Sequence, residues 1–236
     1  EGRLSSSGCA PDHIPGLLGH GEGVTRLNTP TRLPSTLGGE RAVSVSAGAL
    51  HSLALTAGGA VWSWGFGGEG RLGHGDQQDQ LLPKKVEAFA GQRVVAVSAG
   101  EHHSLALTAD GEVWSWGGGS FGKLGHGDEQ NQLLPKKIEA FAGQRVVAVS
   151  AGAGHSLAIT ADGAVWSWGD GDYGKLGHGD QQIQPLPKKV EAFAGQRVVA
   201  VSAGTYRNFA RTVDGAVYAW GEGGRGCLGH GEDLSD

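Results

Sequence analysis

The amino-acid sequence predicts an all-β fold, a β-propeller built of four-stranded blades. Two observations carry this prediction: a unit of 52 residues recurs along the chain, and each unit contains short strand-like runs separated by glycine-rich turns. One unit of this size cannot bury its apolar face alone, so successive units have to stack against one another. A solenoid of helix pairs is excluded, because no stretch keeps an apolar stripe at helical spacing without glycine. An open β-array is the alternative architecture.

The repeat also defines how the chain is divided. His51, His103 and His155 stand one period of 52 residues apart, and the tryptophans keep the same step. We expect an irregular lead (1–17), the tail of a first repeat (18–40), three full repeats (41–92, 93–144 and 145–196) and a truncated repeat (197–236). Because the last unit stops before its closing stretch and the chain contains no methionine, we expect a fragment of a larger ring.

The unit that begins at Arg93 contains the signals of four strands. Its first runs are β-branched or alternate large and small side chains with a period of two, as strands do. Asp110-Gly111 favours a hairpin turn, because both residue types tolerate the positive φ that such turns require. A fourth strand is expected after a glycine-rich loop and Pro135. The expected strands are 94–98, 104–108, 112–116 and 136–141.

Composition excludes several classes of partner. The chain of 236 residues has a formal net charge of −5, so it offers no basic field to nucleic-acid phosphates. No apolar run is long enough for a membrane helix, and the first residues lack the apolar core of a signal peptide. Only Cys9 and Cys227 occur, which argues against a disulfide framework. We therefore expect an intracellular protein, cytoplasmic or nuclear, without nucleic-acid or membrane partners.

The repeated histidines are predicted to be structural. His51, His103 and His155 occupy the same place in different units, so they are spread around a ring and do not converge on one metal ion. We expect one nitrogen of each ring to bond a neighbouring backbone carbonyl. The histidines that stand between glycines are interpreted in the same way: His74, His126, His178 and His230. No catalytic or metal-binding constellation is recognised.

The tryptophans predict packing between blades. Trp64, Trp116 and Trp168 each follow another tryptophan by two residues, which places both rings on one face of a strand. The glycine-rich run 65–70 is superficially similar to a dinucleotide-binding fingerprint, but it opens no helix and so lacks the phosphate-binding geometry. We therefore expect no cofactor.

Three runs of the second full unit carry a resemblance to a known family: 97–107, 113–117 and 124–127. They closely resemble the repeat of the regulator of chromosome condensation family, and the similarity extends over about residues 18–231. The resemblance implies a propeller, commonly seven-bladed, that serves as a protein-binding platform. The fourth copy departs from the pattern, because Arg207-Asn208 replaces the usual His-Ser pair and Tyr218 replaces a tryptophan. The units present fall short of seven, so we expect an incomplete segment of a seven-bladed ring.

The loops that differ between copies are the candidate contact regions. Scaffold positions are nearly invariant from copy to copy, whereas the segment after each tryptophan pair varies in charge and aromaticity. Variable loops on a rigid frame are where binding specificity usually lies. The sequence therefore predicts a non-catalytic scaffold that binds another protein. The candidate contacts are Glu69, Arg71, Phe121, Lys123, Asp172, Tyr173, Lys175 and Arg225.

Two alternatives remain open. The resemblance implies guanine-nucleotide exchange on a small Ran-type GTPase for the founding member of the family, through a projecting hairpin that acts as a wedge. The Leu-Gly-His-Gly tags begin at 72, 124, 176 and 228, and this uniform spacing leaves no room for an inserted wedge in these units. The second alternative is the substrate-recognition part of a HECT-type ubiquitin ligase, whose catalytic domain would lie outside this chain.

Overall fold

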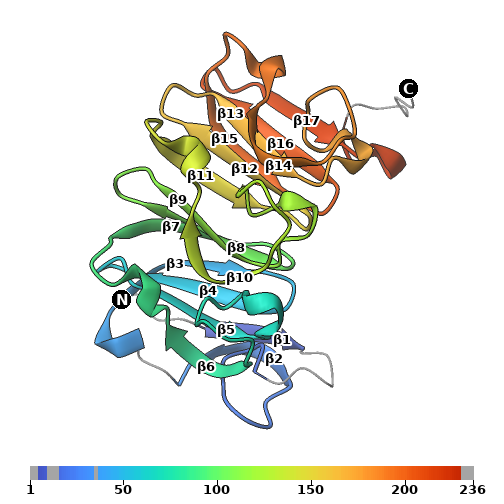
Figure 1. Cartoon of the computed structure of the whole chain (residues 1–236). Coiled ribbons are helices and arrows are strands. Elements are labelled where there is room, and N and C mark those ends of the chain that lie inside the picture. The colour runs from blue at the N-terminus through green and yellow to red at the C-terminus, as the bar shows by residue number, and fades with distance from the viewer. Residues whose placement is uncertain (1–4, 10–15, 35–36, 230–236) are drawn as a thin grey trace.

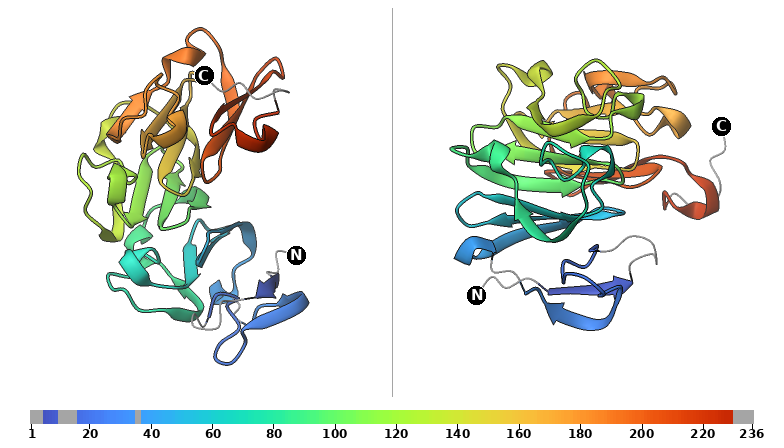
Figure 2. Two further views of the ribbon diagram at one scale, coloured as in Figure 1. Left: turned by 90° about the vertical axis from the view of Figure 1, so that its right-hand side faces the viewer. Right: turned by 60° about the horizontal axis from the view of Figure 1, so that its bottom comes forward.

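The computed structural model describes residues 5–9, 16–34 and 37–229 and shows the expected all-β propeller segment (Figure 1). Each sheet is an antiparallel meander in which consecutive strands pair. The sheets follow one another along a curved row, with the hairpin β1–β2 at one end and β15–β17 at the other (Figure 2). Among the described residues, no helix is long and apolar enough to cross a membrane.

The strands have the following bounds. A two-stranded sheet pairs β1 (Ser5–Cys9) with β2 (Arg26–Arg32). The first four-stranded sheet contains β3 (Ala42–Ala47), β4 (His51–Thr56), β5 (Val61–Gly65) and β6 (Gln80–Lys85). The second contains β7 (Val94–Ala99), β8 (His103–Thr108), β9 (Val113–Gly117) and β10 (Gln132–Lys137). The third contains β11 (Val146–Ala151), β12 (His155–Thr160), β13 (Val165–Gly169) and β14 (Gln184–Lys189). The last sheet contains β15 (Val198–Ala203), β16 (Arg207–Thr212) and β17 (Val217–Gly221).

Short 3-10 turns connect these strands. They are η1 (Leu37–Gly39), η2 (Gly68–Gly70), η3 (Glu87–Phe89), η4 (Ser120–Gly122), η5 (Glu139–Phe141), η6 (Asp172–Gly174), η7 (Glu191–Phe193) and η8 (Gly224–Gly226). We use "blade" for the sheets β3–β6, β7–β10, β11–β14 and β15–β17, in chain order.

Two local expectations differ from the structure. The fourth strand was expected at 136–141, but β10 spans Gln132–Lys137 and η5 follows it. Pro135 fits inside β10 because this strand is at the edge of its sheet, where a missing N–H breaks no hydrogen-bond ladder. Phe141 leaves the strand direction because the 3-10 turn carries its ring into the core. The lead was expected to be irregular, but β1 lies within it and pairs with β2.

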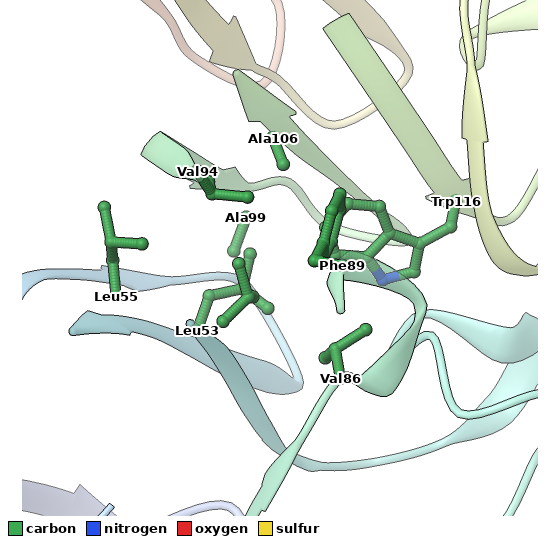
Figure 3. Packing of buried hydrophobic residues seen from close by; sticks show 9 residues of the cluster. Leu53, Leu55, Val86, Phe89, Val94, Ala99, Ala106 and Trp116 are labelled. Atoms are coloured by element: carbon green, nitrogen blue, oxygen red, sulfur yellow. The ribbon is translucent and has the colours of Figure 1, made fainter. Parts of the chain in front are cut away.

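The hydrophobic core lies between blades rather than within them. Leu53 and Leu55 of β4 point toward the next blade, where they meet Ala106 and Trp116, while Ala54 between them faces the other way (Figure 3). Each blade thus presents large aliphatic side chains on one face. Its other face presents alanine side chains together with a tryptophan ring. Phe89 completes the contact, because its ring centroid lies 5.7 Å from that of Trp116 in an edge-on arrangement.

The Leu-Gly-His-Gly tag of one blade packs on the next. Gly73 has φ +79°, and a Cβ on it would lie 2.9 Å from Trp116 Nε1, so only glycine fits there. Gly19 repeats this contact with φ +73° and a distance of 2.8 Å to Trp64 Nε1. The segment around Gly19 therefore docks on β3–β6 as a blade's tag docks on its neighbour, which supports our proposal that 18–40 includes the tail of a repeat.

We predict that Trp116→Ala lowers the free energy of unfolding by about 3–5 kcal/mol, because it removes a fully buried aromatic side chain from the contact between two blades. Urea titration followed by circular dichroism measures the change. Trp62→Ala is the comparison variant, since its ring is only partly buried, and it should cost less. An unchanged midpoint for Trp116→Ala would show that this ring does not hold the blades together.

Candidate functional site

Buried histidines connect each blade to the next. His51 Nε2 lies 2.8 Å from Ser104 Oγ of the following blade, and this hydroxyl donates to the carbonyl of Arg71 at 2.9 Å. The hydroxyl has one proton, so His51 Nε2 has to be the donor in their bond. Ser104 therefore ties two parts of the preceding blade, strand β4 and the loop that ends at Arg71.

The same tie recurs along the row. His103 Nε2 bonds Ser156 Oγ at 2.8 Å, and Ser156 donates to the carbonyl of Lys123 at 2.9 Å. The partner was expected to be a backbone carbonyl, but the ring reaches a hydroxyl that is itself bonded to a carbonyl. The sequence signal for this relay was the serine that follows each of these histidines.

In the last blade Asn208 takes the place of the serine and keeps both functions. Its Oδ1 accepts from His155 Nε2 at 2.6 Å, and its Nδ2 donates to the carbonyl of Lys175 at 2.6 Å. The departure from the His-Ser pattern is therefore conservative at the serine position. Arg207 stands at the histidine position of this blade and is exposed.

Burial holds these histidines in the neutral form. It lowers the pKa of His51 to about 3 and that of His155 to about 4, and it places the pKa of His103 well below the ordinary value. Outside the inter-blade tie, His74 bonds Ser63 at 3.0 Å within its own blade, and partial burial lowers its pKa to about 4. His230 lies outside the described residues.

We predict that the chain loses stability as the pH falls from about 6.5 to about 4. In this window the unfolded chain binds protons at histidines that the folded chain keeps neutral, so each buried histidine contributes about 1.4 kcal/mol per pH unit. Urea midpoints at pH 7, 6 and 5 measure the slope. His103→Gln removes one such site but retains a donor for Ser156. It should reduce the dependence of the unfolding free energy on pH by the contribution of about one proton. A parent midpoint that does not change between pH 7 and 5 would contradict this explanation.

The loop tips carry side chains on a strained backbone. Glu69, Phe121 and Tyr173 occupy equivalent positions in η2, η4 and η6, and their φ values are 60°, 62° and 60°. Left-handed backbone is uncommon for residues other than glycine, and such strain concentrates at ligand-binding and active sites. Phe121 is 44% exposed and Tyr173 is 56% exposed. Three candidates from the sequence therefore lie at the tips of successive loops. Asp172, beside Tyr173, is also exposed, and the side chain of Arg225 lies outside the described part of the structure.

The charged residues that end these loops are buried rather than displayed. Arg71, Lys123 and Lys175 are 2%, 3% and 1% exposed, although we expected them to contact a partner at the surface. Their backbone carbonyls accept hydrogen bonds from the serine or asparagine of the next blade, and these bonds hold the end of each loop against that blade. Of the three, Arg71 is the most extensively bonded: its guanidinium donates to the carbonyls of Gly68 and Glu101 at 2.9 Å each.

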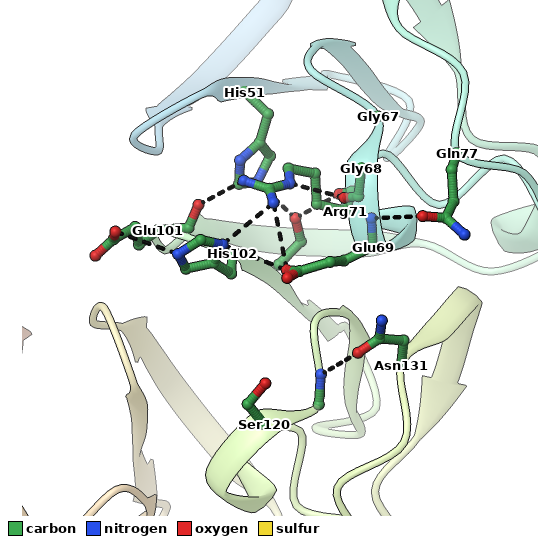
Figure 4. Close-up of polar contacts among 12 residues, drawn as sticks. His51, Gly67, Gly68, Glu69, Arg71, Gln77, Glu101, His102, Ser120 and Asn131 are labelled. Atoms are coloured by element: carbon green, nitrogen blue, oxygen red, sulfur yellow. Dashed lines mark hydrogen bonds and ion pairs between the residues drawn. The ribbon is translucent and has the colours of Figure 1, made fainter.

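A polar cluster surrounds Arg71 (Figure 4). Arg71 Nη2 donates to Glu69 Oε2 at 3.3 Å and lies 3.2 Å from His102 Nδ1. On its other side, His102 Nε2 lies 3.2 Å from Glu101 Oε1. His102 Nδ1 also lies 3.3 Å from Glu69 Oε2, so these contacts form one cluster of Glu69, Arg71, His102 and Glu101. The cluster joins the loop of one blade to the β7–β8 turn of the next.

A pocket of ≈ 250 Å³ opens on this face, beside the cluster. Its polar lining includes Glu69, Glu101, His102, Lys123, Asp170 and Lys175, and its aromatic lining consists of Phe121 and Tyr206. Lys175 is paired with the carboxylate of Asp170, and its ammonium lies 5.7 Å from the ring centroid of Tyr206. In the described part of the chain, no group of three or more His, Cys, Asp and Glu side chains is placed to hold a metal ion.

Comparison with known proteins identifies the family. The model of the RCC1-like domain matches residues 1–236. This chain belongs to the RCC1-like domain family. The human E3 ubiquitin-protein ligase HERC2 is 43% identical over 99% of the chain, which covers 5% of that protein. The Arabidopsis thaliana ultraviolet-B receptor UVR8 is 43% identical over 94% of the chain, which covers 50% of the receptor.

Solved structures agree with this assignment. Yeast RCC1 (Prp20), solved in complex with Kap60, has a TM-score of 0.84 and 27% identity, with 100% of this chain and 55% of that chain covered. Human WBSCR16 has a TM-score of 0.80 and 27% identity, and the match covers 91% of this chain and 56% of WBSCR16. The chain thus spans about half of each of these propellers, as an incomplete segment does.

Sequence reasoning missed several residues of this face: Glu101, His102, Asp170 and Tyr206. Asp170 lies in the variable segment after a tryptophan pair but was not among the candidate contacts. For the other three the signal was also present, because the two residues before each repeated histidine position differ between units: Ala49-Leu50, Glu101-His102, Ala153-Gly154 and Thr205-Tyr206. Glu101, His102 and Tyr206 were overlooked because they lie in turns between short strands, where the sequence alone does not show that they meet the longer variable loops in space.

Proposed function

We propose that the chain is a non-catalytic protein-interaction module of the RCC1 type that binds its partner through the face formed by η2, η4 and η6. One observation supports this most directly: large aromatic side chains are exposed together on this face. Tyr173 and Tyr206 lie with their ring centroids 5.5 Å apart, and Phe121 lines the adjoining pocket. Aromatic residues are enriched at protein interfaces, where they supply large contact areas with few rotatable bonds.

We predict that the double variant Phe121→Gly/Tyr173→Gly loses partner binding and keeps its fold. Glycine is suited to φ near 60°, so the backbone is relieved of strain while both aromatic side chains are removed. Affinity capture from cell extract, with captured proteins identified by mass spectrometry and re-tested in purified form, measures binding.

Val147→Ala is the control for this variant. Val147 is 50% exposed and stands at the end of its blade opposite to the aromatic face, in β11. The control should retain the proteins that the parent captures. Identical captured sets for the parent and the glycine variant, at equal melting temperatures, would show that the partner binds elsewhere.

Two further roles remain proposals. One solved relative, Prp20p from Saccharomyces cerevisiae, is described by its binding to Gsp1p and histones, which favours a test of nucleotide exchange. We predict that this chain does not accelerate release of labelled GDP from a Ran-type GTPase, because the uniform spacing of its repeats leaves no inserted wedge. A release rate that rises with the concentration of the chain would overturn this prediction.

The similarity to HERC2 favours substrate recognition within a larger ligase as the other role, since it extends over 99% of the chain. The full open reading frame that contains this chain decides the matter directly. A HECT-type catalytic domain in the same frame would support recognition of a ligase substrate, and a frame that ends without one would exclude it.

A further inference from the structure

Lys123 is a buried cation without a carboxylate partner of its own. At the equivalent positions, Arg71 is paired with Glu69 and Lys175 with Asp170. Position 118, which corresponds to Asp170 in the unit of Lys123, is glycine. The only hydrogen bond from Lys123 Nζ within the described chain goes to the carbonyl of Ser120, at 3.2 Å. An ammonium has three N–H donors, so two of them point to no protein acceptor although the side chain is almost completely buried.

The hollow beside Lys123 results from a departure from the repeat. The blade after Lys123 has Ala153-Gly154 where its neighbours have Glu101-His102 and Thr205-Tyr206. In the first of those neighbours, His102 lies against Arg71, with Nδ1 3.2 Å from Nη2 of the guanidinium. Gly154 offers no side chain to Lys123, and both Ala153 and Gly154 line the pocket. The side chain nearest to Gly154 is that of Asp170, which would lie 3.2 Å from a Cβ at this position. The unsatisfied cation therefore faces a pocket whose lining has small residues where the neighbouring blades have an imidazole or a phenol ring.

The charges around the pocket limit what fits it. Glu69 is bound to Arg71 and Asp170 to Lys175, while Glu101 is directed to His102 and is 45% exposed. Burial lowers the pKa of Lys123, and the carboxylates of Glu69, Glu101 and Asp170 only partly offset this effect. A dianion such as phosphate would meet these three carboxylates at close range, whereas one further negative charge matches the one cation that lacks a partner.

We propose that the pocket binds a single carboxylate group of the partner, with Lys123 as the binding residue and with Phe121 and Tyr206 on either side of the entering chain. A volume of ≈ 250 Å³ is below that of ordinary small-molecule sites and accommodates one acidic side chain or one chain end. This inference rests on the proposed function and specifies the chemistry that the interaction face recognises.

The test uses the whole 236-residue chain, labelled with ¹⁵N, and follows the amide signal of Gly154 and the ammonium signal of Lys123 during titration. Four probes separate the sources of the charge: N-acetyl-aspartate N-methylamide, N-acetylalanine, neutral N-acetyl-asparagine N-methylamide and inorganic phosphate. Saturable shifts with Kd on the order of millimolar are expected for one or both carboxylates, as for ligands of this size. Of these, the aspartate probe represents a side chain and the alanine probe a chain end.

Three variants decide whether Lys123 is responsible. Lys123→Met keeps most of the buried volume, removes the charge and should weaken carboxylate binding by at least about tenfold, while Lys85→Met, on an exposed strand end, should leave it unchanged. Glu101→Gln removes a competing negative charge and should tighten binding by about two- to fivefold. This last variant keeps the proposal falsifiable even if Lys123→Met does not fold.

Several results would overturn the proposal: equal shifts with the asparagine probe, carboxylate binding that is unaffected by Lys123→Met, or phosphate that binds the same residues more tightly. The proposed function stands or falls separately, because capture of a partner by the aromatic face is measured with Phe121→Gly/Tyr173→Gly. A chain that captures its partner but binds no carboxylate retains the function and loses this inference.

Discussion

The tie from a buried histidine to the next blade's hydroxyl determines the geometry of the whole segment. It satisfies three buried polar groups at once: the imidazole N–H, the hydroxyl and the carbonyl that ends the variable loop. Without the serine, the His51 ring would be buried without a partner, which would destabilise the fold by roughly 1–3 kcal/mol. The carbonyl of Arg71 would keep its second bond, from Trp116 Nε1 at 2.9 Å. The inner strands add a second tie of the same kind, since the amide of Ala99 donates to Ser46 Oγ at 2.9 Å. Loop position and blade spacing are therefore set by the same few atoms.

Much of the fold was predictable because its elements recur in the sequence at regular spacings. The 52-residue step gave the blades, alternation within each unit gave the strands, and Asp-Gly gave the hairpins. The error at the fourth strand has a simple cause: Pro135 was treated as a boundary, but an edge strand tolerates a proline, and the apolar Phe141 that suggested a strand belongs to a 3-10 turn that enters the core.

The candidate site was only partly predictable. Exposed tips such as Phe121 and Tyr173 were found because they vary between copies. Arg71, Lys123 and Lys175 are charged residues at equivalent positions of the same loops. Their burial could not be predicted from the sequence. Whether such a residue is displayed or covered depends on a carbonyl bond made to another blade, at a sequence separation of 33 residues.

Near-identity of the units has a consequence for how this surface can change. The pair at 153–154 has small apolar residues where its counterparts at 101–102 and 205–206 have larger polar or charged ones, and most of the surrounding frame is shared. Moving a cavity to another blade therefore requires no new loop and no change of register, only an exchange of two residues between copies of one gene segment. Recombination between repeats supplies such exchanges directly, so a propeller of this kind can shift its recognition surface around the ring while the buried histidine ties between blades are preserved.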